Sequence, residues 1–572
     1  MSTDTAARPN CALFYAPDGF RTDRKQVKGR HSAGAGFLKG LIDHGGTDRL
    51  VALTESKRDF DDFRALVGEL DEGGRPVVHA HPLDRRTLQS VGTVFLPWPG
   101  LEETAWKRRL GDERDYSLCG VTHTVASNNV IDSLGRYLVA PTQPWDALIC
   151  TSTAVRNVVE RVIQHHADYL ERRGGGRFRC PVRLPVIPLG VDCDFYAPRN
   201  DDLTPGAGPE SRRALRARLG IAEDDLAALF VGRLSFHAKA HPTPMYMAAA
   251  RAAARVRDRE IHLLVTGQFP NRAVGTEFRE AAARFAGGAR VHFLDGLDNA
   301  LVRAAWRASD IFVSLSDNIQ ESFGLAPIEA MAAGLPCVVS DWNGYKDTVA
   351  DGETGFRVPT ATVGPGVGVD LADRHAAGAD SYDQTIGITS LATAVDVDAC
   401  AAAIARLATD RELRARQAAA AMARARRLYD WRVVVAAYQD LWRELAEVRA
   451  ADPGVALRDR REAGRLAFPD PFAMFRHYPT ALLGPDTVVA AKGADPAADL
   501  ARLREGRLNL HDTLAHAFLR PEEVDALLAR LTSDGPKPAA ELFAGSTAER
   551  RKLARTLLWL RKFDLVRFRP PS

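Results

Sequence analysis

The chain has 572 residues, and its 76 lysines and arginines nearly balance its 73 aspartates and glutamates, for a formal net charge of +3. This near balance disfavours a protein coated with nucleic acid, which needs a large basic excess. Hydrophobic residues make up 46% and charged residues 26%. This globular composition excludes a chain that is disordered, collagen-like or coiled coil over its whole length. At about 150 residues per domain, the length allows several cores.

Three further patterns concern the compartment. The seven cysteines form no Cys-x-x-Cys pair and are odd in number, which favours a reducing compartment over a disulfide or zinc framework. The first twenty residues show no basic stretch followed by an apolar one, so we expect no secretory signal. No run of 18 apolar residues is present, so we expect no membrane span. These patterns predict a cytoplasmic protein and leave peripheral attachment to the inner membrane face open.

Short apolar segments alternate with helical patterns over the first 430 residues, which is typical of βαβ units with parallel sheets. Strands are predicted from Cys11, Gly92, Ala147, Leu184, Leu226, Ile261, Val291, Asp310 and Pro336, and helices from Thr243 and Asn299. A stretch rich in proline, glycine and aspartate, Pro198 to Glu210, predicts a linker between two α/β domains, 1–198 and 211–430.

The remaining regions have other patterns. Residues 362–394 are glycine-rich and polar, which predicts a long loop, and such loops are often functional. A helix over 431–450 is expected to cross back to the first domain, and a polar connector with Pro453 follows it. The last part, 475–572, predicts three short helices from Pro521, Pro538 and Thr547 and a strand from Asp564, a weak likeness to a winged-helix module.

The most informative local pattern follows the strand predicted from Asp310. The segment ESFG, from Glu321, leads into a predicted helix over Ala326–Ala333. A glycine between strand and helix lets the backbone approach a ligand, and the helix N-terminus offers N–H groups to a phosphate. Glu321 and Glu329 are eight positions apart, about 12 Å along a helix, which is too far for two carboxyls acting on one glycosidic bond. The spacing fits an extended sugar nucleotide, or else a helix cap and a solvated acid.

A second pattern follows the strand predicted from Leu226. This strand ends at Gly232 and is followed by Arg233 and Lys239. Open α/β sheets bind ligands at the carboxyl ends of their strands, and an arginine fork with a lysine point charge suits a diphosphate. A basic pair in a loop is usually only solvated, so the argument depends on both patterns occurring in one α/β unit.

Together these motifs resemble glycosyltransferase family four, the retaining nucleotide-sugar enzymes of the GT-B type with two facing Rossmann-like domains. The family's Glu-x7-Glu pattern is matched by Glu321 and Glu329, and its G-R-L…K segment by Gly232, Arg233, Leu234 and Lys239. The segments GLAPIEAMAAGLPCVVSD, DGETGF, VIPLGVDCDFYAP and ALICTSTAVRNVV also match, so the resemblance covers roughly residues 12–447.

The resemblance implies transfer of a sugar from a nucleotide diphosphate donor to a hydroxyl of a glycan, glycolipid or small molecule, without a metal or other cofactor. It implies that Arg233 and Lys239 neutralise the diphosphate, that Glu321 contacts sugar hydroxyls and that Glu329 binds the ribose. It places His123 near the donor sugar and acceptor. Further donor contacts are implied around the sugar and phosphates (Ser322, Phe323, Gly324, Leu325), around the nucleobase (Gly267, Gly296, Leu297) and in a glycine loop (Gly34, Gly36).

Other readings of the glycines and acids are less favoured. Gly34, Gly36 and Gly40 could belong to a dinucleotide site, but that fingerprint should directly follow its strand. The acidic pairs Asp192-x-Asp194 and Asp396-x-Asp398 lie within other matched elements or loops, so we predict no metal site. Lys346 and Asp347 stand where the family usually has Pro-Glu, which leaves donor contacts near Asn343 and Gly344 open.

The C-terminal part has no counterpart in the family core. Between Arg550 and Arg569 it carries eight basic residues, Arg550, Arg551, Lys552, Arg555, Arg561, Lys562, Arg567 and Arg569, opposed only by Asp564. This pattern fits a solvated helical face over a core of Leu557, Leu558, Leu560 and Phe563, or a surface for a protein partner or an anionic membrane; we expect no specific nucleic acid.

Two functional alternatives stay open at this stage. The chain could be a non-catalytic sugar-nucleotide-binding regulator with a C-terminal interaction domain, although a sensor need not keep Glu321, Glu329, Arg233 and Lys239 together. It could also be a glycogen- or sucrose-type synthase or a phosphorylase on the same fold, although no motif for a pyridoxal lysine is visible.

Overall fold

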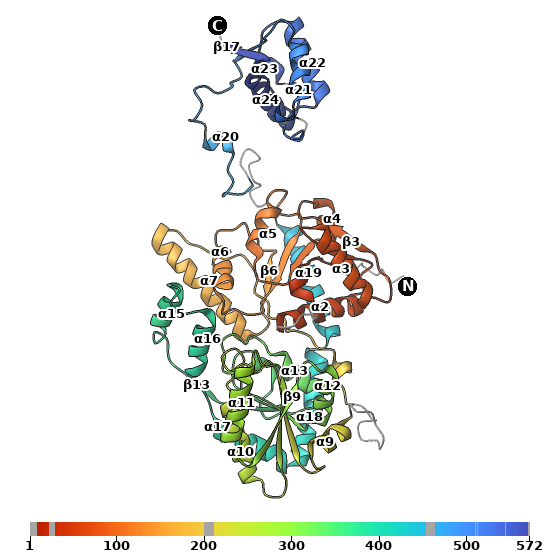
Figure 1. Cartoon of the computed structure of the whole chain (residues 1–572), viewed down its shortest axis with the longest axis vertical. Helices are drawn as coiled ribbons and strands as arrows, with labels where there is room; N and C mark the ends of the chain where they lie inside the picture. Colours follow the sequence, from red (N-terminus) through yellow and green to blue (C-terminus); the bar gives the residue numbers. More distant parts are fainter. Residues whose placement is uncertain are drawn as a thin grey trace. The chain divides into compact units, whose positions relative to one another are not determined.

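The computed structural model describes residues 8–21, 29–198, 211–452, 464–509, 511, 513–543 and 545–569. They form two compact units that divide after Arg465. The larger unit contains two lobes, each built on one parallel sheet (Figure 1). The predicted Rossmann-like pair is therefore confirmed. Of the predicted linker only Pro198 is described, and the connector at Pro453 lies outside the described residues.

The first lobe has a six-stranded parallel sheet of order β3-β2-β1-β4-β5-β6. The strands are β1 (Ala12–Phe14), β2 (Leu50–Leu53), β3 (Val77–Ala80), β4 (Thr93–Leu96), β5 (Ser117–Val121) and β6 (Ala147–Ile149). The helices are α1 (Pro17–Phe20), α2 (Gly29–His44), α3 (Lys57–Leu70), α4 (Arg85–Val91), α5 (Leu101–Arg108), α6 (Asn128–Arg136) and α7 (Thr153–Gly174). Leu13 joins one buried apolar cluster and Ala12 another, because helices cover both faces of the sheet.

The second lobe repeats this plan with the order β12-β11-β10-β7-β8-β9. Its strands are β7 (Leu226–Val231), β8 (Ile261–Gly267), β9 (Ala289–Asp295), β10 (Ile311–Ser314), β11 (Cys337–Ser340) and β12 (Gly355–Val358). Its helices are α9 (Arg212–Leu219), α10 (Pro242–Arg255), α11 (Arg272–Phe285), α12 (Asn299–Ala308), α13 (Leu325–Ala332), α14 (Tyr345–Thr348), α17 (Val397–Thr409) and α18 (Arg411–Leu428). The strand order reverses between β7 and β10, a position where open sheets bind ligands.

The segment from Leu184 is not a strand. It runs from the first lobe toward α8 (Cys193–Tyr196) and forms isolated bridges, such as Val186 to Cys150. In the two parallel sheets, four strands were not predicted, β2, β3, β5 and β12. The strand prediction was wrong here because a short apolar run alone does not distinguish a sheet strand from a buried connector.

Residues 362–394 are also not the predicted long loop. They form helices α15 (Val369–Ala376) and α16 (Tyr382–Leu391), flanked by the antiparallel strands β13 (Thr360–Thr362) and β14 (Thr393–Val395). Ser381 and Gln384 form a capping box at the start of α16. Arg374 and Asp380 form two hydrogen bonds of 2.7 Å across the turn between the helices. Local capping and this ion pair order a segment whose composition predicts a loop.

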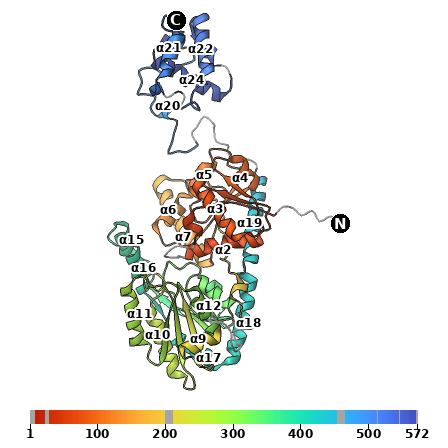
Figure 2. The ribbon, with the colours of Figure 1, turned by 45° about the vertical axis from the view of Figure 1, so that its right-hand side comes forward.

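Helix α19 (Trp431–Ala451) follows α18 and packs on the first lobe, against α2. Figure 2 shows α18 along the second lobe and α19 along the first. Gly34, Gly36 and Gly40 lie inside α2, so the predicted glycine loop is a helix. A Cβ atom on Gly36 or Gly40 would lie 2.9 Å from the ring of Trp431. Two of these glycines therefore permit close packing of α2 on α19.

The smaller unit has its own apolar core around an antiparallel sheet of order β16-β15-β17. The strands are β15 (Val488–Ala491), β16 (Lys537–Pro538) and β17 (Val566–Arg569), and the helices are α20 (Pro471–Met474), α21 (Pro496–Glu505), α22 (Pro521–Ser533), α23 (Ala539–Leu542) and α24 (Thr547–Lys562). The three predicted helices and last strand are confirmed, and α21 was not predicted. Leu558, predicted as core, is 45% exposed because it faces away from Leu557 and Leu560. Among the described residues, no helix is both long and apolar enough to cross a membrane.

Candidate functional site

The two predicted motifs meet where the strand order reverses. Lys239 lies in the loop after β7 and Glu321 in the loop after β10, and their side chains form an ion pair. These side chains are only 15% and 13% exposed. Burial is the largest single influence on the pKa of Lys239 and lowers it, but the charge of Glu321, its hydrogen bond to the lysine and nearby Tyr345 together raise the pKa above its ordinary value. The lysine therefore stays protonated, as an anion-binding residue must.

Hydrogen bonds between the two loops hold this pair in place. Ser316 donates to the carbonyl of Lys239 over 3.2 Å, and Asn318 donates to the carbonyl of His237. The backbone N–H of His241 donates to Asp317 over 3.3 Å. The loops that carry Lys239 and Glu321 thus behave as one structural element rather than as two separate turns.

Helix α13 begins beside this pair. Its N-cap is Gly324, with a φ of 89°, and a Cβ there would overlap the ring of Tyr345. The described structure shows no side chain that caps this helix, so the N–H groups of its first turn can bind an anion. Tyr345 is held at 3.0 Å from Ser314, and burial raises the pKa of its phenol to about 12.

Glu329 does not pair with Glu321. It lies further along α13, where its carboxylate accepts a hydrogen bond from Tyr196 of α8, and burial raises its pKa. The Glu-x7-Glu pattern therefore supplies two separated acidic groups, one beside Lys239 and one beside Tyr196. This arrangement fits contacts to two parts of an extended ligand.

Three glycines line the carboxyl ends of β7, β8 and β9. The N–H of Gly232 donates to Thr266 over 3.1 Å, and that of Gly296 donates to Gly267 over 3.1 Å. A Cβ on Gly296 would lie 2.7 Å from the Cα of Gly267. The strand ends therefore meet backbone to backbone, beside the 65% exposed side chain of Leu297. An exposed apolar side chain beside closely packed backbone can pack against a planar ring.

Ser322 connects the site to the first lobe. Its hydroxyl donates to the carbonyl of His123 over 2.5 Å, and its own carbonyl accepts from Ser152 over 2.8 Å. His123 lies two residues after the end of β5 and lines a small cavity with Gly34, Phe20, Val121 and Trp431. The structure thus places His123 at the lobe contact next to the ESFG segment, with Phe323 itself buried.

The residues that replace the family's Pro-Glu have other partners. Lys346 forms an ion pair with Asp341 over 3.2 Å, and Asp347 accepts from the N–H of Thr153 over 2.6 Å. Asn343, with a φ of 46°, donates to the carbonyl of Glu321. Asn343 therefore fixes the backbone of the site, and Asp347 joins the lobes.

Two contact residues were missed by the sequence analysis. Gln320 accepts from Arg233 over 3.0 Å and donates to Tyr382 of α16 over 3.0 Å. Arg233, which is exposed, also donates to the carbonyl of Ala238 over 3.2 Å. Gln320 could have been considered because it directly precedes Glu321, but Tyr382 lies 62 positions away and has no local signal.

The acidic pairs bind arginines or cap helices. Asp192 and Asp396 cap α8 and α17, Asp194 pairs with Arg432 over 2.5 Å, and Asp398 pairs with Arg251 over 3.0 Å. Helix capping and ion pairs therefore involve the carboxylates of both acidic pairs.

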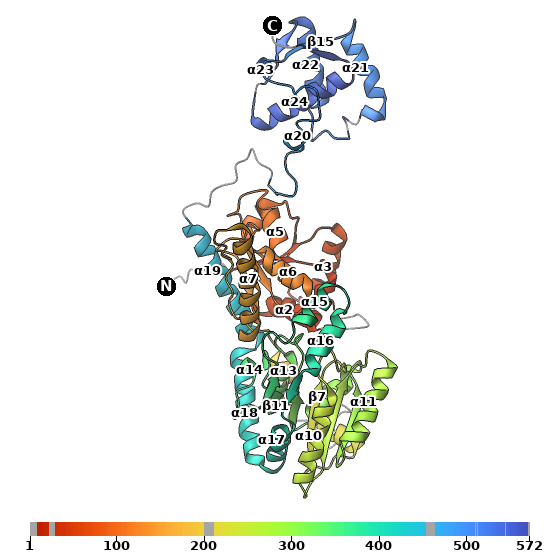
Figure 3. The ribbon, with the colours of Figure 1, turned by 90° about the vertical axis from the view of Figure 1, so that its left-hand side faces the viewer.

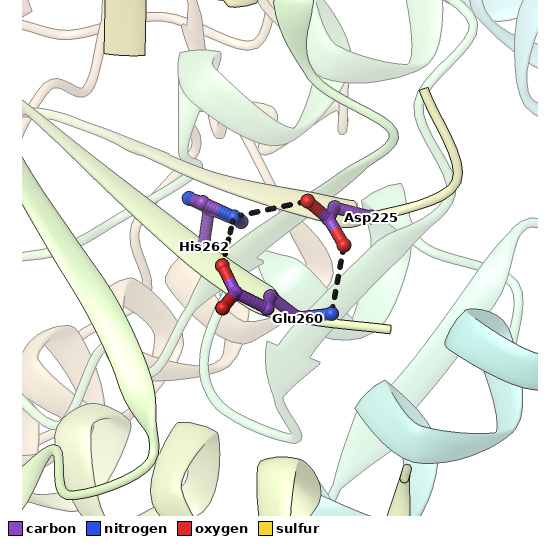
Figure 4. A group of neighbouring side chains, drawn as sticks. All are labelled: Asp225, Glu260 and His262. Atoms are coloured by element: carbon purple, nitrogen blue, oxygen red, sulfur yellow. Dashed lines mark hydrogen bonds and ion pairs between the residues drawn. The ribbon is translucent and has the colours of Figure 1, made fainter. Parts of the chain in front are cut away.

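A third acidic group, Asp225, Glu260 and His262, lies at the amino ends of β7 and β8, at the opposite end of the sheet from Lys239 (Figure 4). His262 lies 3.4 Å from each carboxylate. Histidine with two carboxylates is a possible zinc ligand set. However, Asp225 accepts N–H groups of Ala222 and Glu260, each over 2.8 Å, and Glu260 pairs with Arg290 over 2.7 Å. These bonds tie the strand ends together, which is a structural role.

Comparison with known proteins finds the family described as "Glycosyl transferases group 1", whose model matches residues 211–363. The D-inositol 3-phosphate glycosyltransferase of Geodermatophilus obscurus is 34% identical over 203 residues, which are 35% of this chain and 42% of that protein. That of Corynebacterium glutamicum is 34% identical over 180 residues, 31% and 40% of the two chains. The chain thus spans less than half the length of these curated relatives.

Solved structures are similar at low identity. Anabaena HepE in complex with UDP and glucose is 17% identical, with a TM-score of 0.47 over 77% of this chain and 100% of that chain. Sucrose-phosphate synthase from Thermosynechococcus elongatus gives the same identity, TM-score and coverage.

Proposed function

We propose that this chain, whose residues 211–363 match the model of the glycosyl transferases group 1 family, is a retaining glycosyltransferase. It moves a sugar from a nucleotide diphosphate to an acceptor hydroxyl. The observation that carries the proposal is the buried ion pair of Lys239 and Glu321 beside the uncapped N-terminus of α13. A permanent cation and oriented N–H groups at one point of a sheet edge suit a diphosphate leaving group.

Different residues bind different parts of the donor. Lys239, Arg233 and the first turn of α13 bind the diphosphate, and Glu321 orients the sugar. The surface formed by Gly267, Gly296 and Leu297 binds the nucleobase, and Glu329 binds the ribose. When the sugar–phosphate C–O bond breaks, the acceptor oxygen bonds to the same face of the sugar, and its proton passes to the leaving phosphate. Fixed protein charges stabilise that phosphate, so we propose a reaction that needs no metal.

The test compares two substitutions in the pair. Lys239→Ala removes a charge that stabilises the leaving group, so sugar transfer should fall by roughly 10²- to 10³-fold. Glu321→Gln should reduce transfer similarly but keep binding of the nucleotide diphosphate, because the cation remains. Donors are first found by a thermal-shift screen of UDP-, GDP- and ADP-sugars, since a bound donor raises the melting temperature.

Rates near wild type for both variants would contradict the assigned site. Transfer that survives EDTA treatment supports the metal-independent proposal, and loss of transfer restored by a divalent cation contradicts it. Tight donor binding without turnover toward any hydroxyl acceptor would favour the regulator alternative.

The acceptor and other partners are also proposals. We propose a carbohydrate or lipid-linked acceptor that enters from the side of the first lobe, near His123. The C-terminal unit, with its basic α24, is proposed to contact a protein partner or an anionic membrane surface. Two of its basic side chains are engaged by internal contacts, because Arg555 donates to the carbonyl of Ala517 and Arg561 pairs with Asp564. These contacts leave fewer positive charges for a partner.

A further inference from the structure

Helix α16 packs directly on the loop that carries Arg233 and Lys239. Ser390 donates to the buried carboxylate of Asp317 over 2.8 Å, and Asp383 lies 4.0 Å from His237. The approach is close enough that a Cβ on Gly387 would lie 3.3 Å from the Cβ of His237. Two side-chain contacts and one close backbone approach therefore place α16 against the donor-binding loops.

One chain of hydrogen bonds leads from α16 to Arg233. The hydroxyl of Tyr382 accepts from the amide nitrogen of Gln320, whose amide oxygen accepts from Arg233, each over 3.0 Å. Because Arg233 can only donate, the Gln320 amide oxygen faces it, and the Tyr382 hydroxyl accepts from the amide nitrogen on the other side. The Tyr382 contact therefore limits rotation of the Gln320 side chain that holds the arginine. An exposed arginine otherwise samples many rotamers, and ordering it on ligand binding costs free energy. These hydrogen bonds order Arg233 before a ligand binds, so less free energy is spent on ordering it during binding.

The two helices are themselves held from the other side. His375 of α15 is 3.0 Å from Asn128, at the start of α6 in the first lobe, and the Arg374–Asp380 pair closes the turn to α16. Figure 3 shows α15 next to α6, with α16 between α15 and the second lobe. Tyr382, the first residue of α16, thus projects from a segment fixed to both lobes.

We propose that Tyr382 is a positioning residue for binding of the donor diphosphate: through Gln320 it holds Arg233 in the orientation that meets the terminal phosphate. This inference rests on the proposed function, because it requires that Arg233 bind the diphosphate. It assigns the helices at 369–391 a role in donor affinity that the family motifs do not contain.

The test is a double-mutant cycle on the full chain, with UDP as the probe and GDP or ADP in its place if the thermal-shift screen prefers that base. Calorimetry measures affinity for the nucleoside diphosphate and the matching monophosphate in wild type, Tyr382→Phe, Arg233→Ala and the double variant. Tyr382→Phe should weaken the diphosphate about three- to tenfold and leave the monophosphate unchanged. In the Arg233→Ala background, Tyr382→Phe should leave the affinities for both the diphosphate and the monophosphate unchanged.

Tyr169→Phe serves as the matched control, because it removes one hydroxyl from a tyrosine that is 56% exposed on α7. Equal diphosphate affinity of Tyr382→Phe and wild type would overturn the proposal, as would a loss of the same size with Arg233 absent. A wild-type chain that binds no nucleoside diphosphate would instead overturn the proposed function. Melting temperatures of all variants distinguish these outcomes from unfolding.

Discussion

Asp317, in the loop after β10, is a buried acid with a raised pKa. Its side chain is 3% exposed, it accepts hydrogen bonds from Ser390 and from the N–H of His241, and burial raises its pKa to about 6. Asp317 joins α16 to the loop that carries Lys239. Its charge state therefore affects the packing of the site as well as the stability of the fold.

Asp317→Asn should change how stability depends on pH. Because the folded-state pKa lies above the unfolded value, the protonated form favours folding, and this contribution is complete below about pH 4 and lost as the pH rises through 6. A shift from 3.8 to about 6 corresponds to about 3 kcal/mol. Asparagine does not titrate, so the variant should gain up to that amount over wild type between pH 4 and pH 7.

Urea unfolding of both proteins at several pH values measures this difference in the free energy of unfolding. The exposed Asp370→Asn, on α15, is the control and should follow wild type. Parallel pH profiles for wild type and Asp317→Asn would contradict the prediction.

Among the helices and strands, the sequence predicted those that are marked by a local pattern of residues. The strands β7, β8 and β10 are apolar runs bounded by turn residues, and α13 follows its glycine as expected. Helix α16 was missed although its Ser381–Gln384 capping box is visible in the sequence, because the glycine and polar content of 362–394 outweighed it.

The site was predictable where residues lie within one motif. Glu321 and the start of α13 follow from one continuous segment, whereas the contact of Arg233 with Gln320 spans 87 positions and that of Gln320 with Tyr382 spans 62. Such contacts depend on how the loops fold over the sheet edge, which periodicity and motif spacing do not encode.

The glycines of α2 are another case in which the sequence pattern does not predict a contact between distant residues. In the sequence, Gly36 and Gly40 resemble part of a ligand loop, but in the structure they face the ring of Trp431 on α19. Glycine in a helix interior is unfavourable by about 1 kcal/mol relative to alanine. The close contact of two helices offsets this cost.

Gly36→Ala should therefore destabilise the protein despite the better helix propensity of alanine. The new methyl group would lie 2.9 Å from Trp431, and overpacking of this kind typically costs about 1–3 kcal/mol. Gly68→Ala on α3 is the matched control, since a Cβ there meets nothing within 4 Å and should stabilise by up to about 1 kcal/mol. Denaturant unfolding measures both. Equal stabilisation by the two substitutions would contradict the packing role, and a selective loss of donor affinity by Gly36→Ala would instead support a ligand role.

Within the larger unit, polar contacts hold the two lobes together around the site. Ser322 reaches the carbonyl of His123, Ser152 reaches the carbonyl of Ser322, and Asp347 accepts the N–H of Thr153 at the start of the 22-residue helix α7. A carboxylate at a helix N-terminus is favoured by the helix dipole. Because Ser322 directly follows Glu321, opening of the lobes breaks contacts next to the site.

Asp347→Ala should shift the lobes toward an open arrangement. A hydrogen bond to a charged group contributes about 1.5–3 kcal/mol, so its loss should change the ratio of closed to open molecules by roughly ten- to a hundredfold. X-ray scattering of the ligand-free protein should then show a larger radius of gyration, and kcat/KM should fall because closure completes the site. Asp347→Asn keeps an acceptor without the charge and should give an intermediate result. Superimposable scattering curves for Asp347→Ala and wild type would show that the remaining serine contacts suffice, and would place the control of closure at Ser152 and Ser322 instead.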